Sequence, residues 1–368
     1  MFIKNIHIKN FRNYKEEIVS FNKKFNIIIG KNGQGKTNLI ESIYLMSIGK
    51  SFRSFNDNDM IQLDQDNALI NGVICKKYSE VDIQILLSRK NKKIIKLNQT
   101  PLRRNSQILN NVYIVCFTPE DLRIVKDGPE KRRNFINREL CQIKPLYYSQ
   151  LYKYNKILVQ RNACLKNINN FNKKDDMMLD IWNKEMIKYG INLIKNREEF
   201  IKRLNNISKK IHAKLTNEKE NLEILYDCSV DKAEEIKEEN YYKKLKETEK
   251  KDIMRGYTSI GPHKDDLIIK INGIDVRNFG SQGQQRTASL SLKLAEIKLI
   301  AEETGEIPIL ILDDVLSELD QYRQNYLVNF LKNMQVFITT TEIKEFIVKD
   351  LQEYSIFNIQ EGNIEKKQ

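Results

Sequence analysis

An octapeptide near the N-terminus, GKNGQGKT at residues 30–37, constrains the fold of this 368-residue chain more than any other feature. It fits the pattern G-x-x-x-x-G-K-[ST] and follows an apolar run that reads FNIII. After it comes a segment with apolar residues at helical spacing, which stops at Gly49. A strand, a glycine-rich turn and a helix in this order predict a phosphate-binding loop within an α/β fold.

The residues of this loop have separate expected roles in binding ATP. The glycines let the backbone turn its N–H groups toward the phosphates, and the helix N-terminus adds its positive end. Lys36 is expected to reach the β- and γ-phosphates, and the Thr37 hydroxyl to ligate Mg²⁺. The predicted nucleotide-binding residues are Gly30, Lys31, Asn32, Gly33, Gln34, Gly35, Lys36 and Thr37.

A second motif lies near the C-terminus, where IPILILDDVLSELD spans residues 307–320. The apolar run predicts a buried strand, and two adjacent aspartates stand at its end. Asp313 is expected to ligate Mg²⁺ together with Thr37, because the strand end brings its carboxylate beside the ion. Asp314 is the predicted catalytic residue, which would orient the attacking water.

A glutamine-rich turn, FGSQGQQR at residues 279–286, opens a long predicted helix far from the phosphate loop in sequence. A phosphate loop contacts ATP from one side and leaves the γ-phosphate open on the other. Ser281, Gln282, Gly283 and Gln284 offer a capping hydroxyl, a close backbone approach, a side-chain amide and a second helix N-terminus. We therefore expect two chains arranged head to tail, each of which completes the other's ATP site.

The chain is predicted to form two lobes, since a single core usually stops growing at about 250–300 residues. We expect residues 1–128 and 301–368 to form an ATPase lobe that carries both phosphate-site motifs. Residues 129–300 are expected to form a mostly helical second lobe that carries the glutamine-rich turn.

Hydrophobic periodicity supports this division. From about Pro129 to about Leu245 the apolar residues recur at helical spacing, and residues 182–215 predict one helix about 50 Å long. The polar stretch at residues 167–176 predicts the bend of an antiparallel helical hairpin. Elsewhere, strand-like runs lie at residues 69–74, 81–88, 112–117, 266–273 and 335–342.

The charge and the cysteine content indicate which kind of partner the protein binds and in which cellular compartment it lies. The balance of 62 Lys+Arg against 49 Asp+Glu gives a net charge of +13, which favours a polyanion such as DNA. A Lys-, Asn- and Ile-rich composition inherited from an AT-rich genome is the alternative. The 5 cysteines lack the paired spacing of a zinc or redox site, and no segment has the apolar length of a membrane span. These features predict a cytoplasmic protein without a membrane partner.

Together the motifs resemble those of ATP-binding-cassette (ABC) ATPases. GSQGQ stands where that superfamily carries its Leu-Ser-Gly-Gly-Gln signature, and SELD at residues 317–320 resembles its D-loop, with Ser317 and Asp320 as the D-loop candidates. The wide separation of the two motifs, with a helical hairpin between them, points to the branch of structural-maintenance-of-chromosomes (SMC) proteins and Rad50-like repair ATPases. Within it, KNFRNY, PEDLRIVKDGPEKRRNFIN and SIGPHKDDL resemble a bacterial family of recombination mediators.

The resemblance implies an ABC-type P-loop ATPase head, with ATP and Mg²⁺ as cofactors and a mostly helical second lobe. It also implies an ATP-dependent homodimer that binds single-stranded, gapped or junction DNA, loads recombinase with the mediators RecO and RecR, and supports the SOS response. Asp314 stands where transporter-type relatives have a glutamate, which suggests slow hydrolysis. The switch histidine of relatives is absent, and Thr339, Thr340 or Thr341 stands in its region.

Two other classes share these motifs. The ATPase subunit of a transporter carries its signature much nearer to the phosphate loop, and in a long-armed scaffold ATPase the insert contains a long coiled coil, for which this chain has no room. Several residues keep open roles. His263 is expected to make a turn contact rather than bind metal, and Arg12 and Arg53 to contact nucleotide or a partner chain. The cluster Lys131–Arg133 is either a solvated basic face or a DNA contact, and the Q-loop glutamine, expected near Glu120, is unassigned.

Overall fold

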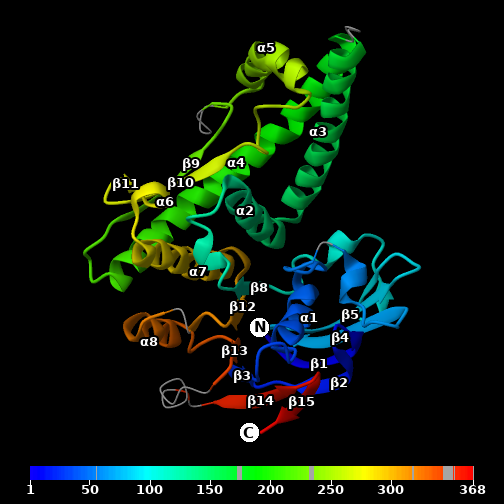
Figure 1. Ribbon diagram of the computed structural model, residues 1–368, viewed down its shortest axis with the longest axis vertical. Helices are drawn as coiled ribbons and strands as arrows, with labels where there is room; N and C mark the ends of the chain where they lie inside the picture. Colours follow the sequence, from blue (N-terminus) through cyan, green and yellow to red (C-terminus); the bar gives the residue numbers. More distant parts are fainter. Residues whose placement is uncertain are drawn as a thin grey trace. The chain divides into compact units, whose positions relative to one another are not determined.

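The chain divides into two compact units in the computed structural model (Figure 1). The structure describes residues 1–54, 56–171, 176–231, 236–316, 319–342, 351 and 353–367. Unit 1 contains Met1–Leu122 and Glu296–Gln368, and unit 2 contains Arg123–Ala295. The divisions lie slightly before residues 128 and 300, where the sequence analysis set them.

The nucleotide-binding motifs of unit 1 belong to one mainly parallel sheet with the strand order β15-β14-β3-β13-β12-β8. Its strands are β3 (Phe25–Ile29), β8 (Ile114–Phe117), β12 (Ile309–Asp313), β13 (Val336–Thr340), β14 (Tyr354–Gln360) and β15 (Asn363–Lys366). All neighbours pair in parallel except β14 and β15. Parallel strands end at the same edge of a sheet, so the residues that follow β3 and β12 meet there.

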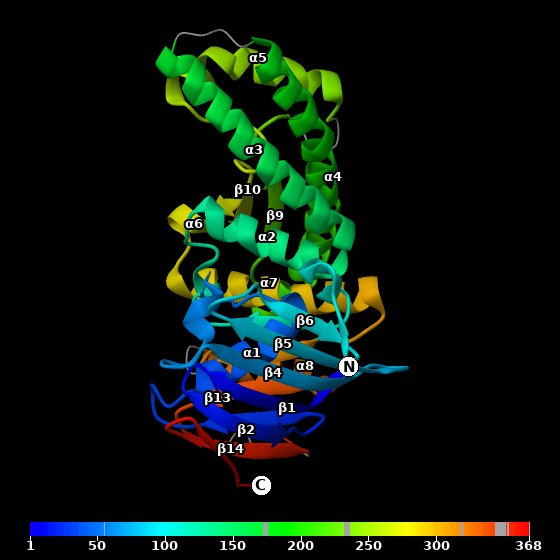
Figure 2. The ribbon, with the colours of Figure 1, turned by 90° about the vertical axis from the view of Figure 1, so that its right-hand side faces the viewer.

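A second sheet of unit 1 is antiparallel throughout, with the order β2-β1-β4-β5-β6-β7 (Figure 2). Its strands are β1 (Phe2–Phe11), β2 (Tyr14–Ser20), β4 (Asn67–Cys75), β5 (Glu80–Ser88), β6 (Ile94–Leu97) and β7 (Thr100–Pro101). β4 and β5 alternate buried and partly exposed residues, as a sheet with one core-facing side requires.

Helix α1 (Lys36–Ile48) packs against strands of both sheets, which explains why it is buried on nearly every side. The predicted end of this helix at Gly49 is confirmed. It ends where Gly49 adopts a left-handed conformation with φ 68°, because glycine does so without steric cost. Unit 1 also contains helix α8 (Gln321–Phe330) and the 3₁₀ turns η1 (Asp57–Met60) and η2 (Asn105–Ile108).

Unit 2 is mostly helical, as predicted. Its helices are α2 (Pro129–Ile143), α3 (Pro145–Phe171), α4 (Asp176–Leu215), α5 (Glu238–Arg255), α6 (Val276–Phe279) and the first part of α7 (Gln282–Thr304), and a 3₁₀ turn, η3 (Asp121–Arg123), lies at the division. α3 and α4 pack together as the expected hairpin (Figure 1). α4 has 40 residues and contains the predicted helix at 182–215. Its length is about 60 Å.

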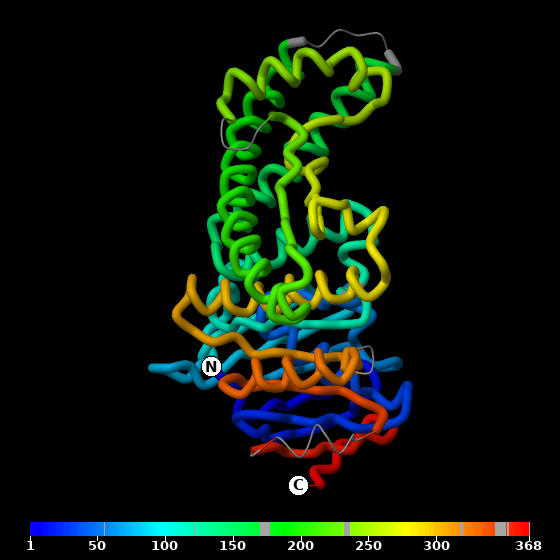
Figure 3. The backbone as a smooth tube through the Cα atoms, turned by 90° about the vertical axis from the view of Figure 1, so that its left-hand side faces the viewer, coloured from blue at the N-terminus to red at the C-terminus, as the bar shows by residue number. Residues whose placement is uncertain are grey.

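A small antiparallel sheet in unit 2, ordered β11-β10-β9, corrects one prediction. It consists of β9 (Leu222–Asp227), β10 (Asp266–Ile271) and β11 (Ile274–Asp275), and β9 runs alongside α4 (Figure 3). Helical spacing was predicted through about Leu245, which is wrong for β9. Six residues are too few for periodicity to separate a strand from a helix, and pairing with β10 decides the conformation.

Buried arginines of the unit 2 hairpin contact α5, the loop after it and the SIGPHKDDL segment at residues 259–267. Arg161 of α3 contacts the Asp252 carboxylate at 3.0 Å and the Thr258 hydroxyl at 2.6 Å. Arg197 of α4 donates to the Pro262 carbonyl at 2.5 Å and lies 3.6 Å from Asp265. Buried charges of this kind are tolerated only when paired and hydrogen-bonded. The segment is therefore held to α4, and it leads directly into β10.

Candidate nucleotide-binding site and signature turn

Glycines shape the phosphate loop between β3 and α1. Gly33 adopts φ 81° and Gly35 adopts φ 120°, both in the region that favours glycine. A Cβ on Gly30 would lie 2.5 Å from the Ile359 carbonyl oxygen in β14, so a larger residue does not fit there. The chain thus turns sharply after β3 and presents the N-terminus of α1 toward the loop, as an anion site requires.

Lys36 is folded into the loop and is only 8% exposed. Its Nζ donates to the carbonyl oxygens of Gly30 at 2.5 Å and Lys31 at 3.1 Å. Burial lowers the pKa of the ammonium group, and the nearby carboxylates of Asp314 and Asp313 oppose this shift. The loop therefore encloses a positive charge where the β- and γ-phosphates are predicted to bind.

The carboxylate of Asp313 faces the start of α1 and fits a magnesium site. Thr37 Oγ1 lies 3.4 Å from Asp313 Oδ1. Two oxygens that ligate one Mg²⁺ at about 2.1 Å lie about 3 Å apart in an octahedral shell, so this spacing suits a shared ion. Among the described residues, no group of three or more His, Cys, Asp or Glu side chains is placed to hold a metal. Phosphate and water ligands would complete the shell, as they commonly do around Mg²⁺.

Thr339, at the end of β13, holds both aspartates and was one of the threonines noted in the sequence. Its hydroxyl donates to Asp313 Oδ1 at 2.7 Å, and its oxygen accepts from the Asp314 backbone N–H at 3.0 Å. Burial raises the pKa of Asp313, and the hydrogen bonds from Thr339 and Thr37 partly offset it. A bound cation would favour the charged form of this carboxylate.

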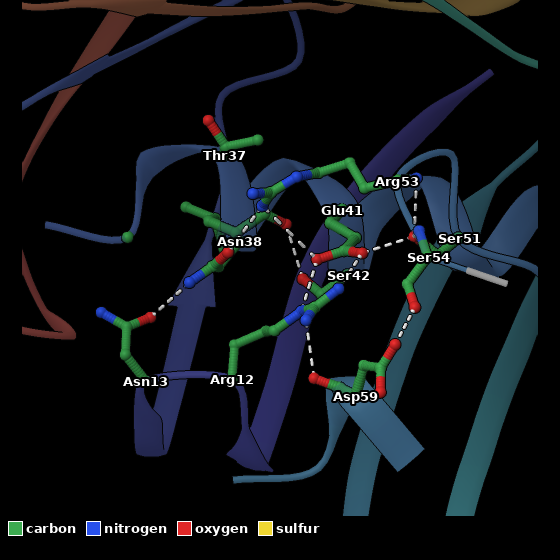
Figure 4. A network of polar contacts seen from close by, with 12 residues as sticks. Arg12, Asn13, Thr37, Asn38, Glu41, Ser42, Ser51, Arg53, Ser54 and Asp59 are labelled. Carbon is green, nitrogen blue, oxygen red and sulfur yellow. Dashed lines mark hydrogen bonds and ion pairs between the residues drawn. The ribbon is translucent and has the colours of Figure 1, made fainter. Parts of the chain in front are cut away.

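The NFRNY motif supports the phosphate loop, a role that sequence reasoning missed. The Asn13 side chain donates to the Gln34 carbonyl at 2.9 Å, and the buried Tyr14 hydroxyl donates to the Gly35 carbonyl at 2.9 Å. Asn38, one residue after Thr37, donates to the Asn13 side chain at 2.8 Å (Figure 4). The start of β2 thus fixes the carbonyls that precede α1.

The C-terminal hairpin closes on the same loop. The Glu361 backbone N–H donates to Gln34 Oε1 at 2.6 Å, and the Gly362 N–H donates to the Gln34 carbonyl at 3.2 Å. A Cβ on Gly362 would lie 2.3 Å from the Asn13 carbonyl oxygen, so this turn also approaches β1 and β2 closely. Gln34 is therefore a structural anchor of the loop, besides its predicted contact with nucleotide.

Arg12 forms its hydrogen bonds with residues of unit 1. Its guanidinium donates to both carboxylate oxygens of the buried Glu41 at 2.9 and 2.7 Å, and to the Asp59 carbonyl at 2.6 Å (Figure 4). Arg53 donates to Asn38 at 2.9 Å and remains 46% exposed at its side chain. Both arginines line an open cavity of about 460 Å³ next to α1. Arg53 is the more accessible of the two for a nucleotide or a partner.

The glutamine-rich turn forms a reciprocal cap at the start of α7. The Gln284 N–H donates to Ser281 Oγ at 3.2 Å, while the Ser281 N–H donates to Gln284 Oε1 at 3.0 Å. Ser281, Gln282 and Gly283 are exposed. The turn therefore keeps a defined shape at the surface of unit 2.

The D-loop candidate Asp320 and the predicted Q-loop region belong to different elements of unit 1. Asp320 caps α8, since its carboxylate accepts from the Arg323 N–H at 2.9 Å, whereas Ser317 lies outside the described residues. Glu120, near which the Q-loop glutamine was expected, lies in FTPED at residues 117–121, which begins with the last residue of β8, and the Thr118 N–H donates to Asp121 Oδ2 at 2.8 Å. The Q-loop glutamine stays unassigned.

The basic cluster at residues 131–133 is not a uniform surface. Arg132 is 2% exposed, and it binds both carboxylate oxygens of Asp266 at 2.6 and 2.9 Å. Both expected roles, a solvated face and a DNA contact, are wrong for Arg132. Arg133 is partly buried and donates to the Asp265 carbonyl at 2.9 Å.

His263 makes the expected turn contact. Its Nδ1 lies 2.8 Å from the Tyr154 hydroxyl, and its Nε2 lies 3.0 Å from the Thr258 carbonyl. Burial lowers the pKa of the imidazole to about 4, so the ring is neutral at physiological pH.

The fold and the site define an ABC-type ATPase head of the SMC class, and sequence comparison agrees. The family described as RecF/RecN/SMC N terminal domain matches residues 2–365. The DNA replication and repair protein RecF of Alkaliphilus oremlandii is 45% identical over 372 residues, which cover 99% of this chain and 100% of that protein. RecF of Clostridioides difficile is 46% identical over 368 residues, which cover 99% of this chain and 98% of that protein. The chain belongs to the RecF family.

Solved structures give the same result. The recombination mediator protein RecF in a complex described as RecF-ATPrS in the RecFOR pathway superposes with a TM-score of 0.93 at 36% identity, covering 100% of this chain and 98% of that one. The corresponding RecF-ATP structure gives 0.91 with the same coverage. An Smc head from Pyrococcus furiosus, 15% identical, shares the fold with a TM-score of 0.56. The predicted ABC-type head is confirmed. No helix among the described residues has the length and apolarity to span a membrane.

Proposed function

We propose that this chain is an ATP-dependent DNA-binding protein of replication and recombinational repair. Two copies join through Mg²⁺-ATP, the joined pair holds DNA, and slow hydrolysis releases it. Relatives that are 45% and 46% identical to this chain are DNA replication and repair proteins, and two solved RecF structures that superpose on it carry ATP or ATPrS in their descriptions. The phosphate loop, Thr37 and Asp313 supply the groups that such a nucleotide and its ion need.

The observation that carries the two-chain arrangement is Gly283. A Cβ there would meet only the Ser281 hydroxyl oxygen, at 3.9 Å, and the residue lies in the first turn of α7. Glycine in a helix lowers stability by up to about 1 kcal/mol relative to alanine. A glycine that no neighbouring atom requires therefore needs another explanation. Close approach of a ligand from outside the chain is such a reason, and the γ-phosphate bound to a second copy is the ligand that we propose.

In this arrangement the Ser281 hydroxyl and the N–H groups of the first turn of α7 contact the partner's nucleotide. Helix N-termini favour anions, because these N–H groups have no partner within the helix and the helix dipole is positive there. Gln282 and Gln284 shape this turn. Asp320 and Ser317 are proposed as the D-loop residues.

Asp314 is proposed to orient the attacking water. It follows β12 directly and adopts φ 54°, an uncommon conformation for a residue other than glycine. The carboxylate side chain is one methylene shorter than the glutamate of faster relatives. We therefore propose that ATP hydrolysis serves as a slow switch rather than as a source of rapid turnover.

The proposed partners are DNA and two mediator proteins. The net charge of +13 favours a polyanion. The matched RecF structures are described within the RecFOR pathway, which supports RecO and RecR as partners here. We propose that the dimer binds single-stranded, gapped or junction DNA, helps to load recombinase and supports the SOS response in the cytoplasm.

The ATPase subunit of a transporter and an SMC-like or Rad50-like scaffold are less well supported alternatives. The relatives with full-length coverage carry repair names, and the hairpin of α3 and α4 is short beside a long coiled coil. Copurification with a membrane protein would favour the first alternative. Rods in electron micrographs would favour the second.

Sedimentation with and without Mg²⁺-ATP tests the proposal. Wild type is expected to become a dimer with ATP. Lys36→Met is expected to lose ATP binding, whereas Ser281→Arg is expected to bind ATP and remain monomeric, because a bulky cation would occupy the junction. Wild type that stays monomeric with bound ATP would overturn the two-chain arrangement.

DNA binding is tested separately through its salt dependence. The binding constant is expected to fall with salt, with a log-log slope of about 0.9 per phosphate contact on duplex and about 0.7 on single strands. A response that is flat in salt would contradict a polyanion-binding surface.

A further inference from the structure

The side chain of Gln284 is held by a residue outside the signature turn. Its amide nitrogen donates to Glu220 Oε1 at 2.9 Å, and Glu220 lies in the loop between α4 and β9. The second carboxylate oxygen of Glu220 lies 3.1 Å from His212 Nε2, in the last turn of α4. A chain of polar contacts therefore links the end of the long helix to the start of α7.

The far side of His212 also contacts α7. The imidazole is fully buried, and its Nδ1 lies 3.0 Å from the hydroxyl oxygen of Ser291. Ser291 in turn contacts the carbonyl of Thr287, one helical turn earlier, at 2.7 Å. The ring is thus fixed between Glu220 and α7, and this fixes the position of the carboxylate.

The chemistry of a carboxylate gives this contact a direction. An ionised carboxylate accepts hydrogen bonds and donates none, whereas a glutamine amide has one donating and one accepting end. Glu220 therefore selects the orientation of Gln284 in which the nitrogen faces Glu220. In that orientation the oxygen of Gln284 faces Ser281, where it accepts the Ser281 N–H and closes the reciprocal cap.

We infer that Glu220, oriented by His212, is a positioning residue for the signature turn. It selects the Gln284 orientation that holds Ser281 and the first turn of α7 ready for the nucleotide of a second copy. This inference depends on the proposed two-chain function. Glu220 itself contacts no nucleotide in this arrangement, so its removal affects dimer formation and leaves the phosphate loop of the same chain intact.

Substitutions at Glu220 test the inference through ATP-dependent dimerisation, measured by sedimentation over a range of protein concentrations. Glu220→Ala is expected to raise the concentration needed for half-dimerisation about tenfold, as loss of a hydrogen bond to a charged group would. Its ATP affinity as a monomer is expected to match wild type. Glu220→Gln retains an accepting oxygen and is expected to restore dimerisation.

Glu218→Ala is the matched control, because it removes the same charge from an exposed position two residues away. It is expected to dimerise like wild type. Should Glu220→Ala melt at a lower temperature, Glu220→Leu keeps most of the side-chain volume and allows the same comparison.

The outcomes separate the inference from the function on which it depends. Failure of wild type to dimerise with ATP contradicts the proposed function. Dimerisation of wild type together with unchanged dimerisation of Glu220→Ala contradicts the inference alone. Equal losses in Glu220→Gln and Glu220→Ala would also contradict it, since the accepting oxygen would then be irrelevant.

Discussion

The phosphate loop and the signature turn both contain glycines at the start of a helix, but the neighbours that surround these glycines differ. In the loop, Gly30 lies against the backbone of β14, and Gly35 needs a left-handed conformation beside Asn13. In the signature turn, Gly283 has open space around its missing side chain. The chain's own fold requires glycine at positions 30 and 35. At position 283 the fold does not require glycine, and the proposed ligand from a second copy does. Substitutions at these glycines and at the residues around them can separate the two kinds of requirement.

Gly30→Ala is expected to have the largest effect. Its new methyl group would lie 2.5 Å from the Ile359 carbonyl oxygen, so β14 or the loop must shift. The free energy of unfolding is expected to fall by about 2 kcal/mol, with loss of ATP binding. Urea unfolding measures the change in stability, and nucleotide titration measures the loss of ATP binding. Gly283→Ala is the matched control, and equal unfolding curves for the two variants would refute the contrast between the sites.

Asp313→Asn is expected to stabilise the nucleotide-free protein at pH 7 while removing Mg²⁺-dependent ATP binding. Burial raises the pKa of Asp313 above its usual 3.8, so ionisation of this carboxylate costs stability above that pH. The advantage of the variant should therefore disappear as pH falls below 3.8. Unfolding of both proteins in a chelator from neutral to acidic pH measures the difference, and parallel curves would argue against the raised pKa.

Tyr14→Phe removes the hydroxyl that donates to the Gly35 carbonyl. The free energy of unfolding is expected to fall by about 1 kcal/mol, and ATP affinity several-fold, because a buried acceptor loses its donor. Tyr78→Phe is the control, since Tyr78 is largely exposed. If both variants bind ATP like wild type, the support of the loop by NFRNY is not important for binding.

Gly283→Ala is expected to have the smallest effect on stability, a gain of up to about 0.5 kcal/mol, because alanine favours helix and no neighbour obstructs it. Its ATP-dependent dimerisation is nevertheless expected to fail, because the methyl group would occupy the space proposed for the γ-phosphate. Sedimentation with ATP measures this. A variant that dimerises as well as wild type would remove the main support for the trans arrangement.

Sequence patterns predicted the parts of the site that are local. The strand at residues 25–29, the turn and the helix at residues 36–48 are contiguous, so one continuous segment contains their hydrophobic period and their glycines. The strand before Asp313 was predictable for the same reason, since a fully apolar run bounded by aspartates indicates a buried parallel strand.

The supports of the site could not be predicted in this way. Asn13, Tyr14 and Glu361 act on backbone carbonyls or on Gln34 across long sequence separations, and such hydrogen bonds leave no periodic pattern. Arg132 looked like part of a basic surface because its partner, Asp266, lies 134 residues later. Charge along a sequence cannot distinguish an exposed arginine from one that is paired inside the fold.

The position of β3 has a consequence for synthesis on the ribosome. Strand β3 pairs with β13 and β14, and the turn after β14 closes on Gln34. These partners are synthesised long after β3, so a nascent chain carries its complete ATP-binding motif before the neighbours of that motif exist. Nucleotide binding must therefore await translation of β13 and β14, and chains truncated before them expose β3 as an unpaired apolar strand that is prone to aggregate.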